Sequence, residues 1–353
     1  MIYISSKKLQ QGMRVGRPVY DDDGRVLLNT GVTLNELYIA KLIEKSIPGI
    51  YVAVDETEDI QIPEIISQQT RLTAIKQVKY VFESVQVGKT LDITPLSQSV
   101  NSIIDEIFAN QNVLINLSEI RTFDGYTFAH SVNVCVLSIV LGLKFELSEL
   151  ELKELAMGAI LHDIGKLNIP TYILNKPGRL NGSELAEIKK HPLQGWQILR
   201  NHPEISLLSA HVAFQHHEQP NGQGYPRQLI EEQICHYAKI VGVVDAYDAM
   251  TSVRPYRNAM QPSQALHLIR QLSGIQFSQS VADCFLKCVA PYPIGTRVLL
   301  NTREVGVVVD VNSTNRDRPI IRLLFRPDGK KYNKYQEIDL AKEDFLSIEK
   351  SLL

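Results

Sequence analysis

A helical spacing of apolar residues dominates the middle of this chain, from about residue 123 to residue 290. The spacing is clearest in the first stretch, at Val132, Cys135, Val136, Ile139, Val140 and Leu143. Intervals of three and four residues place apolar side chains on one face, so this stretch predicts a helix with one buried face. Further helices are predicted around 183–200, 204–217, 231–252, 262–272 and 278–289. The central region is therefore expected to be an all-helical domain.

A second core helix is predicted to begin after Ser148, which is followed by Glu151 in the spacing of a capping box. Its apolar positions lead directly into the pair His162-Asp163. Gly165 is placed to end the helix. The polar pair is thus expected at a helix end, where its side chains can point into the helical core.

The two ends of the chain differ from its centre. Residues 1–56 alternate apolar and polar positions around turn signals, which predicts a small α+β module. Residues 57–119 are predicted to hold a linker and connecting helices, and residues 120–290 the helical domain. Residues 291–353 contain β-rich runs separated by turn residues, which predicts a small β module. The expected fold class is multi-domain and mainly α, with an all-helical core between two small modules.

Composition excludes several classes of protein. The chain has 353 residues, 44% of them hydrophobic and 22% charged, as in ordinary globular proteins. Its net charge of -2 argues against binding of nucleic-acid polymers, which normally requires a basic excess. No stretch approaches the roughly 20 apolar residues that span a bilayer, and the polar start is untypical of a secretory signal. We therefore expect a cytoplasmic protein without a membrane partner.

The adjacent pair His162-Asp163 is the strongest chemical signal. Its imidazole offers a nitrogen to one metal ion, and its carboxylate has two oxygens, so it can bridge to a second ion. A single histidine on an apolar helix face is more often a hydrogen-bonded core residue. That interpretation is adopted for His202, His211, His236 and His267.

The remaining candidate ligands follow the same helical core. His130 lies near the start of the first core helix, His191 is predicted within a helix, and His216-His217 ends another. Asp245 sits in an apolar run, where a carboxylate costs several kcal/mol unless it is paired or ligated. Because these residues make sense only together, they predict a dinuclear metallohydrolase.

Six motifs follow one another along the helical region. They are Tyr126–Ser131, Leu161–Lys166, Lys176–Leu180, His191-Pro192, His216–Pro226 and Val244–Arg257. In this order they resemble the HD-GYP phosphodiesterases, a bacterial subgroup of the HD phosphohydrolase superfamily, and the match covers roughly residues 120–290.

The resemblance implies two divalent transition-metal ions per chain, iron or manganese. One ion would take His130, His162, Asp163 and Asp245, and the other would take Asp163 as a bridge with His191, His216 and His217. Nitrogen-rich ligation suits such ions better than magnesium. Two ions about 3.5–4 Å apart can hold a bridging hydroxide as the nucleophile for in-line attack on phosphorus.

The resemblance also implies substrate contacts at Lys166, Gly222, Gly224, Tyr225, Arg254 and Arg257. Lys166, three residues after Asp163, is expected to point at the phosphate and to act with that aspartate in catalysis. The glycines allow close backbone approach to a ligand, and Tyr225 offers a ring or a hydroxyl. Arginine suits phosphate through its rigid fork of donors. Read alone, the glycine motif is a tight turn and the arginines a solvated helix end.

Three residues depart from the family pattern. Tyr126 stands where some members have a glutamate for a third metal, so two ions are expected. Gln219 replaces a frequent arginine, and Asn221 replaces an aspartate. Neither residue is a ligand, but both can reshape the substrate loop.

The function implied is a bacterial signalling phosphodiesterase that hydrolyses cyclic di-GMP to pGpG and/or GMP. Two alternatives stay open. One is an adaptor of low activity that binds cyclic di-GMP or the GGDEF domain of a diguanylate cyclase. The other is a hydrolase of another cyclic dinucleotide. The end modules are expected to regulate the enzyme or to form a homodimer, with the helix at 64–87 against the partner chain.

Overall fold

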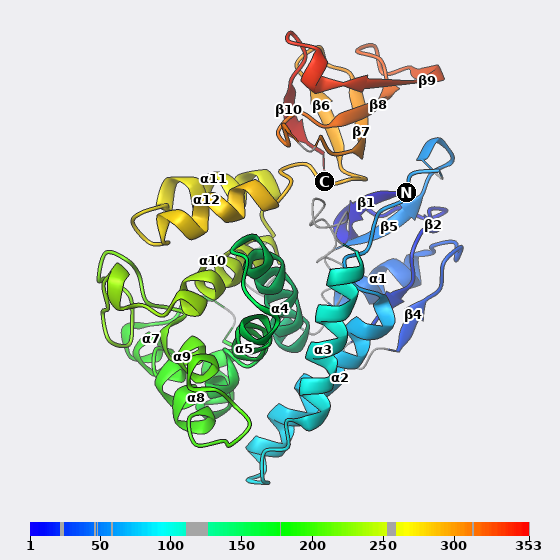
Figure 1. The fold of residues 1–353 in the computed structure, drawn as a ribbon. Helices are drawn as coiled ribbons and strands as arrows, with labels where there is room; N and C mark the ends of the chain where they lie inside the picture. The colour runs from blue at the N-terminus through cyan, green and yellow to red at the C-terminus, as the bar shows by residue number, and fades with distance from the viewer. Residues whose placement is uncertain are drawn as a thin grey trace.

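The computed structural model describes all residues except 22–24, 46, 48, 58, 111–125, 177, 253–258, 313 and 353, and the side chains of 126 and 127. Its helices are α1 (Glu36–Glu44), α2 (Gln68–Gln86), α3 (Thr94–Ala109), α4 (Tyr126–Lys144), α5 (Glu149–Ile160), α6 (Thr171–Leu174), α7 (Gly182–Ile188), α8 (His191–Leu199), α9 (Leu207–Gln215), α10 (His236–Thr251), α11 (Pro262–Leu272) and α12 (Gln279–Cys288). Its strands are β1 (Ile2–Ser5), β2 (Arg14–Val15), β3 (Val19–Tyr20), β4 (Val26–Leu28), β5 (Gly49–Ala53), β6 (Arg297–Leu300), β7 (Val305–Asp310), β8 (Ile320–Phe325), β9 (Lys331–Asp339) and β10 (Ile348–Ser351). Figure 1 shows the helices from α2 onward gathered in one body, with α1 and the strands of the two chain ends beside it.

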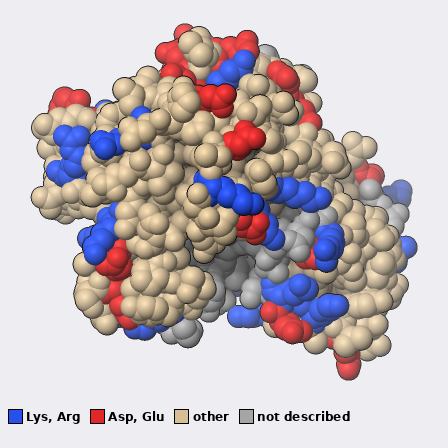
Figure 2. Space-filling view, turned by 90° about the horizontal axis from the view of Figure 1, so that it is seen from below, with Lys and Arg blue, Asp and Glu red and all other residues tan. Residues whose placement is uncertain are grey.

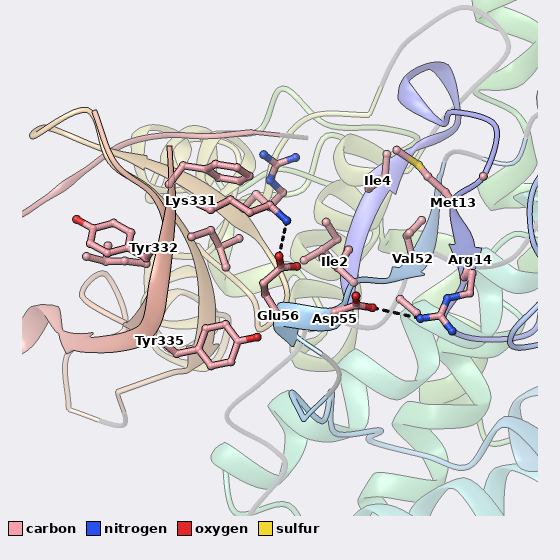
Figure 3. Close-up of a pocket in the computed structure, with 17 residues that line it drawn as sticks. Ile2, Ile4, Met13, Arg14, Val52, Asp55, Glu56, Lys331, Tyr332 and Tyr335 are labelled. Carbon is pink, nitrogen blue, oxygen red and sulfur yellow. Dashed lines mark hydrogen bonds and ion pairs between the residues drawn. The ribbon is translucent and has the colours of Figure 1, made fainter. Parts of the chain in front are cut away.

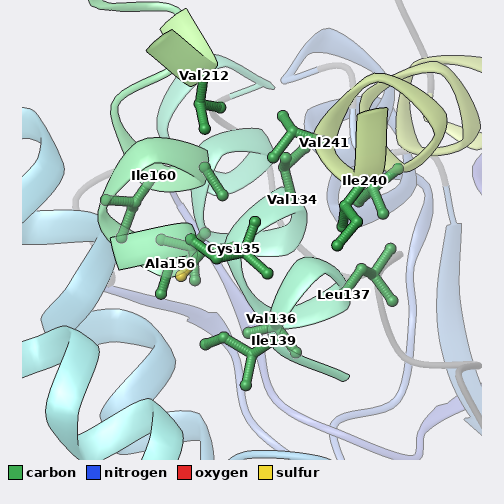
Figure 4. Close-up of a cluster of buried hydrophobic side chains, with 14 of the residues drawn as sticks. Val134, Cys135, Val136, Leu137, Ile139, Ala156, Ile160, Val212, Ile240 and Val241 are labelled. Carbon is green, nitrogen blue, oxygen red and sulfur yellow. The ribbon is translucent and has the colours of Figure 1, made fainter. Parts of the chain in front are cut away.

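Helix α4 lies at the centre of the helical body. It packs against α5, α10, α2 and α12. Every residue from 130 to 142 is buried, so the predicted single buried face is wrong. Figure 4 shows apolar side chains of α5, α9 and α10 packed around α4. The predominantly apolar sequence fits this position, because a helix with apolar residues all round is typical of a protein core.

The connecting helices α2 and α3 belong to the same core as α4. Ala74, Val78 and Phe82 of α2 and Ile103 and Ile107 of α3 are among its buried side chains. Since these two helices pack against α4 and each other, they extend the helical body beyond the motif-bearing region.

The predicted cap of α5 is confirmed. The Ser148 hydroxyl accepts a hydrogen bond from the backbone N–H of Glu151, and the Glu151 carboxylate accepts one from the backbone N–H of Ser148. This reciprocal pair satisfies two N–H groups that a helix start otherwise leaves open. It fixes the start of the helix whose other end carries His162 and Asp163.

The strands form small antiparallel sheets at the two ends of the chain. The N-terminal region contains a sheet in the order β1-β5-β2 and the hairpin β3-β4, and the C-terminal region contains the order β10-β6-β7-β8-β9. Both regions flank a helical core, so the predicted fold class is confirmed.

The two chain ends also share one hydrophobic core. Ile4 and Val52 of the N-terminal sheet belong to the same buried cluster as Val298, Val307 and Ile321 of the C-terminal sheet. The backbone N–H of Tyr3 reaches the carbonyl of Gly295 across this contact. We call residues 1–62 and 290–352 the end body, because they pack as one unit.

Candidate metal centre

Four helices and one short turn bring the seven predicted ligands together. The seven are His130 in α4, His162 and Asp163 just beyond α5, His191 in α8, His216 and His217 at the end of α9, and Asp245 in α10. Three groups have ligand atoms that all lie within 4.8 Å of one another: His191 with His216 and His217, His130 with His162 and Asp245, and His162 with Asp163 and His216. Residues that are 115 positions apart in the sequence therefore meet at one point.

Two local predictions at this centre are wrong. His191 is the first residue of α8 rather than a mid-helix residue, because α7 ends just before it. Gly165 does not end α5, which stops at Ile160, but lies in the 3-10 helix η4 (Ile164–Asn168). A Cβ atom on Gly165 would lie 2.0 Å from the carbonyl oxygen of His191, so glycine is needed for close contact with α8.

Asp163 occupies the middle of the cluster, and its two oxygens face different histidines. Its Oδ2 atom lies 3.4 Å from Nε2 of His162 and 3.9 Å from Nε2 of His130. Its Oδ1 atom lies 3.4 Å from Nε2 of His191 and 3.9 Å from Nε2 of His216. A carboxylate placed between two sets of imidazoles has the arrangement that a bridging ligand needs.

Hydrogen bonds on Nδ1 orient three of the imidazoles. Nδ1 of His162 donates to the carbonyl of Ala159 at 2.7 Å, and Nδ1 of His191 donates to the carbonyl of Ile188 at 2.7 Å. Nδ1 of His216 donates to the carbonyl of Ala213 at 3.0 Å. Because a carbonyl only accepts, the proton sits on Nδ1, and Nε2 keeps the lone pair that a metal ion requires.

Two buried atoms of the cluster have no hydrogen-bond partner among the described residues. They are Nε2 of His162 and Oδ1 of Asp163. A buried polar atom left in this way costs about 1–3 kcal/mol. Both atoms are ligand types for first-row transition ions, so the donor set fits bound metal better than an empty core.

Burial lowers the pKa of the histidines on one side of Asp163. It lowers the pKa of His191 to about 4 and that of His217 to about 3, so both are neutral near pH 7. Burial works against an ionised Asp163, but Lys166 and His162 outweigh it and hold the pKa of the carboxyl well below its ordinary value. Neutral imidazoles around an ionised carboxylate are the protonation states in which these groups bind metal.

A family model described as an HD domain matches residues 102–281, which is more than half of the chain. This chain is an HD domain protein. A second model, described as a KOW domain associated with HD domain, matches residues 297–352 of the C-terminal sheet. The expected membership of the HD superfamily is thereby confirmed.

Several curated relatives of this HD domain protein are phosphodiesterases by name. A cyclic di-GMP phosphodiesterase of Pseudomonas aeruginosa is 34% identical over 262 residues, which cover 74% of this chain and 63% of the relative. One of Thermotoga maritima is 40% identical over 184 residues, 52% of this chain and 50% of the relative. The chain thus spans between half and 63% of the length of these relatives.

A solved structure shares the fold of the HD domain protein. It is an HDGYP protein from Bdellovibrio bacteriovorus, which is 19% identical and aligns with a TM-score of 0.52. The alignment covers 81% of this chain and 98% of that one.

Asp248 of the HD domain contacts the cluster, although the sequence did not predict it. It is fully buried, one turn after Asp245 on α10, and its Oδ2 accepts a 2.6 Å hydrogen bond from Nδ1 of His130. Its Oδ1 accepts one from Asn133 at 3.2 Å, and Oδ1 of Asn133 accepts one from Arg71 of α2 at 2.6 Å. The Asp-x-x-Asp spacing could have revealed it, because residues three apart share a helix face.

Of the residues predicted to contact substrate, Lys166 and Tyr225 contact the cluster directly, whereas the glycines do not. Nζ of Lys166 is 2.5 Å from Oδ2 of Asp163, and the Tyr225 ring stacks on His217 at 4.7 Å between centroids. Gly224 packs against backbone: a Cβ there would lie 2.3 Å from the backbone nitrogen of Gln219. Gly222 has a φ of +73°, which glycine adopts without strain. The glycines therefore shape the loop itself.

Glu218, which the sequence did not predict as a site residue, holds this loop in place. Its carboxylate is buried and accepts hydrogen bonds from the backbone N–H groups of Arg227 at 2.7 Å and Leu229 at 2.9 Å. It follows directly on His217, so the loop is attached to the end of α9. Its position directly after two candidate ligands could have indicated a role in the site.

Beside the cluster lies a pocket of about 240 Å³. Its lining includes His217, Tyr225 and Asp245, together with Lys239 and Phe277. Arg254, Arg257 and the side chain of Tyr126 fall outside the described part of the chain. Gln219 lines the pocket, whereas Asn221 holds the loop by accepting a 3.0 Å hydrogen bond from the backbone N–H of Gln223.

The distribution of charge on the surface agrees with the composition. On the face in Figure 2, basic and acidic side chains lie interspersed among uncharged ones, as the net charge of -2 leads one to expect. Within the described residues, none of the helices has the length and apolar character that crossing a membrane requires.

Proposed function

We propose that this HD domain protein is a metal-dependent phosphodiesterase that hydrolyses cyclic di-GMP to pGpG and/or GMP. The position of Asp163 between two sets of imidazoles carries the proposal, because a centre for two ions needs one shared carboxylate. The names of its relatives from Pseudomonas aeruginosa and Thermotoga maritima support cyclic di-GMP as the substrate.

The proposed ligands divide into two sets that share Asp163. One set is His130, His162 and Asp245, and the other is His191, His216 and His217. Divalent iron or manganese ions, when bound, would supply Lewis acidity for the attack of water on phosphorus. The protein orients the imidazoles through their Nδ1 hydrogen bonds, which also fix the protonation state that ligation needs.

Lys166 is proposed to bind the phosphate under attack. Its ammonium lies 2.5 Å from Asp163 and its side chain is partly exposed, so it can reach a group held at the cluster. A fixed positive charge there stabilises the charge that develops on the phosphate oxygens. Tyr225, stacked on His217, would present its other face or its hydroxyl to the substrate. Arg254 and Arg257 remain proposed phosphate contacts.

The test is metal analysis of anaerobically purified protein, run alongside cyclic di-GMP hydrolysis with iron or manganese supplied. About two metal ions per chain and the appearance of pGpG or GMP are expected. The variant His162→Ala should lose metal and turnover and keep its helical circular dichroism spectrum. His267→Ala is the matched control, since this histidine is exposed on α11. Full turnover in His162→Ala would contradict the proposal.

A second substrate has specific support. Two relatives from Vibrio cholerae are named 3'3'-cGAMP-specific phosphodiesterases, 35% identical over 146 residues and 32% over 202 residues. Hydrolysis rates measured side by side with cyclic di-GMP, 3'3'-cGAMP and linear pGpG would show which of the two cyclic dinucleotides is the substrate. Binding of cyclic di-GMP by metal-loaded protein without product would instead favour the adaptor.

A further inference from the structure

A second pocket lies in the end body, away from the metal cluster. Its volume is about 430 Å³, within the range of about 300–1,000 Å³ typical of small-molecule sites. Figure 3 shows residues from both ends of the chain around it: Ile4, Met13 and Arg14 on one side, and Lys331 and Tyr335 on the other. Neither end of the chain forms this pocket alone.

The charges that line this pocket do not cancel. Its cations are Arg14, Arg297 and Lys331, and its anions are Asp55 and Glu56. Three positive charges and two negative ones leave a net charge of +1. Arg14 pairs with Asp55 at 3.2 Å, and Lys331 pairs with Glu56 at 2.5 Å. The excess positive charge among these lining residues is therefore that of Arg297.

The environment of Arg297 favours the binding of an anion. Its Nε atom is buried, and no hydrogen-bond acceptor in the described part of the chain reaches it. Partial burial lowers the pKa of Arg297, and no carboxylate among the residues that the structure describes offsets this effect. Removing a guanidinium from water without a counter-charge costs free energy, which an anion in the pocket would recover.

The remaining walls are apolar and aromatic. Ile4 and Val52 come from the N-terminal sheet, and Phe325, Tyr332 and Tyr335 come from the C-terminal sheet. Flat rings favour a flat ligand, because aromatic pairs gain from offset or edge-to-face contact in addition to apolar burial. A planar body therefore suits these walls.

We propose that this pocket binds a small aromatic anion, with its charge on Arg297 and its ring between the two sheets. Because the ligand touches both ends of the chain, its binding stabilises the end body. The site is separate from the proposed catalytic centre and does not depend on bound metal.

The test is calorimetric titration of the full chain with naphthalene-2-carboxylate and with its neutral isostere, naphthalene-2-carboxamide. Wild type is expected to bind the carboxylate at least tenfold more tightly than the amide. Arg297→Gln should abolish that preference, and Arg297→Lys should restore part of it. Arg303→Gln is the control, because Arg303 lies in the turn between β6 and β7, is exposed and pairs with Glu349 instead.

A measurement on the unmutated protein locates the ligand. With methyl-labelled methionine, the carboxylate should shift the Met13 resonance, since Met13 lines the pocket, and leave that of Met157 in the helical core unchanged. Equal affinities of wild type for the acid and the amide, an unshifted Met13 signal, or absence of binding would each overturn the proposal.

Discussion

Four imidazoles of the metal cluster are held by a hydrogen bond at Nδ1, and for His130 the acceptor is a carboxylate. Burial opposes protonation of His130, but its hydrogen bonds with Asp245 and Asp248 outweigh burial and raise its pKa to about 10. Asp245 contacts the Nε2 side at 3.1 Å, whereas Asp248 holds Nδ1 at 2.6 Å. Asp248 therefore sets which nitrogen of His130 is available to a metal ion.

Asp248→Asn should weaken metal binding without removing a ligand. An amide can turn its NH₂ group towards Nδ1, which moves the imidazole proton to Nε2 and blocks ligation. Loss of such a hydrogen-bonding partner costs about 10–100-fold in metal affinity. Titration of metal into the apoprotein measures the change. Asp105→Asn, at an exposed position of α3, should bind like wild type, and an unchanged affinity of Asp248→Asn would exclude this role.

At the scale of elements, the contact between η4 and α8 places His191 opposite Asp163. The two backbones meet at Gly165 and Gly195, where a Cβ on Gly165 would lie 2.4 Å from the Gly195 nitrogen. Such an approach is possible only where a side chain is absent, so the position of α8 depends on glycine at residue 165.

Gly165→Ala should destabilise the fold by about 3 kcal/mol, because the added methyl group meets backbone that cannot move aside. It should also reduce metal occupancy, since α8 carries His191. Urea denaturation and metal content measure the two effects. Gly182→Ala is the matched control, with no atom within 4 Å of its Cβ. Equal stability of the two variants would show that α8 shifts at no cost.

The loop from Gln219 to Ile230 is a second element whose position depends on one side chain. Glu218→Ala leaves the N–H groups of Arg227 and Leu229 without their acceptor, at about 1–3 kcal/mol for a buried unsatisfied group. Hydrogen exchange at these two amides should accelerate, while exchange within α4 stays slow. Turnover should fall as well, because Tyr225 belongs to this loop. Unchanged exchange at both amides would mean that other contacts hold the loop.

At the scale of the whole molecule, Arg322 joins the chain ends. It is buried in the C-terminal sheet and reaches both carboxylate oxygens of Asp59 at 2.6 Å, across 263 residues of sequence. It also contacts Glu337 at 2.7 Å. A planar guanidinium with two parallel bonds to one carboxylate gives this contact a defined geometry.

Arg322→Gln should lower the free energy of unfolding by about 2 kcal/mol, less than for a fully buried pair, because Asp59 is largely exposed. Denaturant titration gives the value, and hydrogen exchange in β1 should rise together with that in β8. Arg303→Gln breaks the exposed pair with Glu349 and should cost less than about 1 kcal/mol. Similar losses in both variants would argue against a special role for Arg322.

The sequence alone determined the mainly helical fold class, the cap at Ser148 and the set of residues that meet at the cluster. The fold class and the cap follow from local patterns, because helical periodicity and capping depend on neighbours within a few positions. The set of cluster residues follows from the ordered motifs that resemble the HD-GYP phosphodiesterases. Only the tertiary structure decided that α4 is buried on all sides, that Gly165 serves packing against α8, and that Asp248 supports His130. It also joined the two chain ends around one core and one pocket. Contacts between residues hundreds of positions apart leave no periodic trace in a single sequence, so the fold must bring them together before they can be recognised.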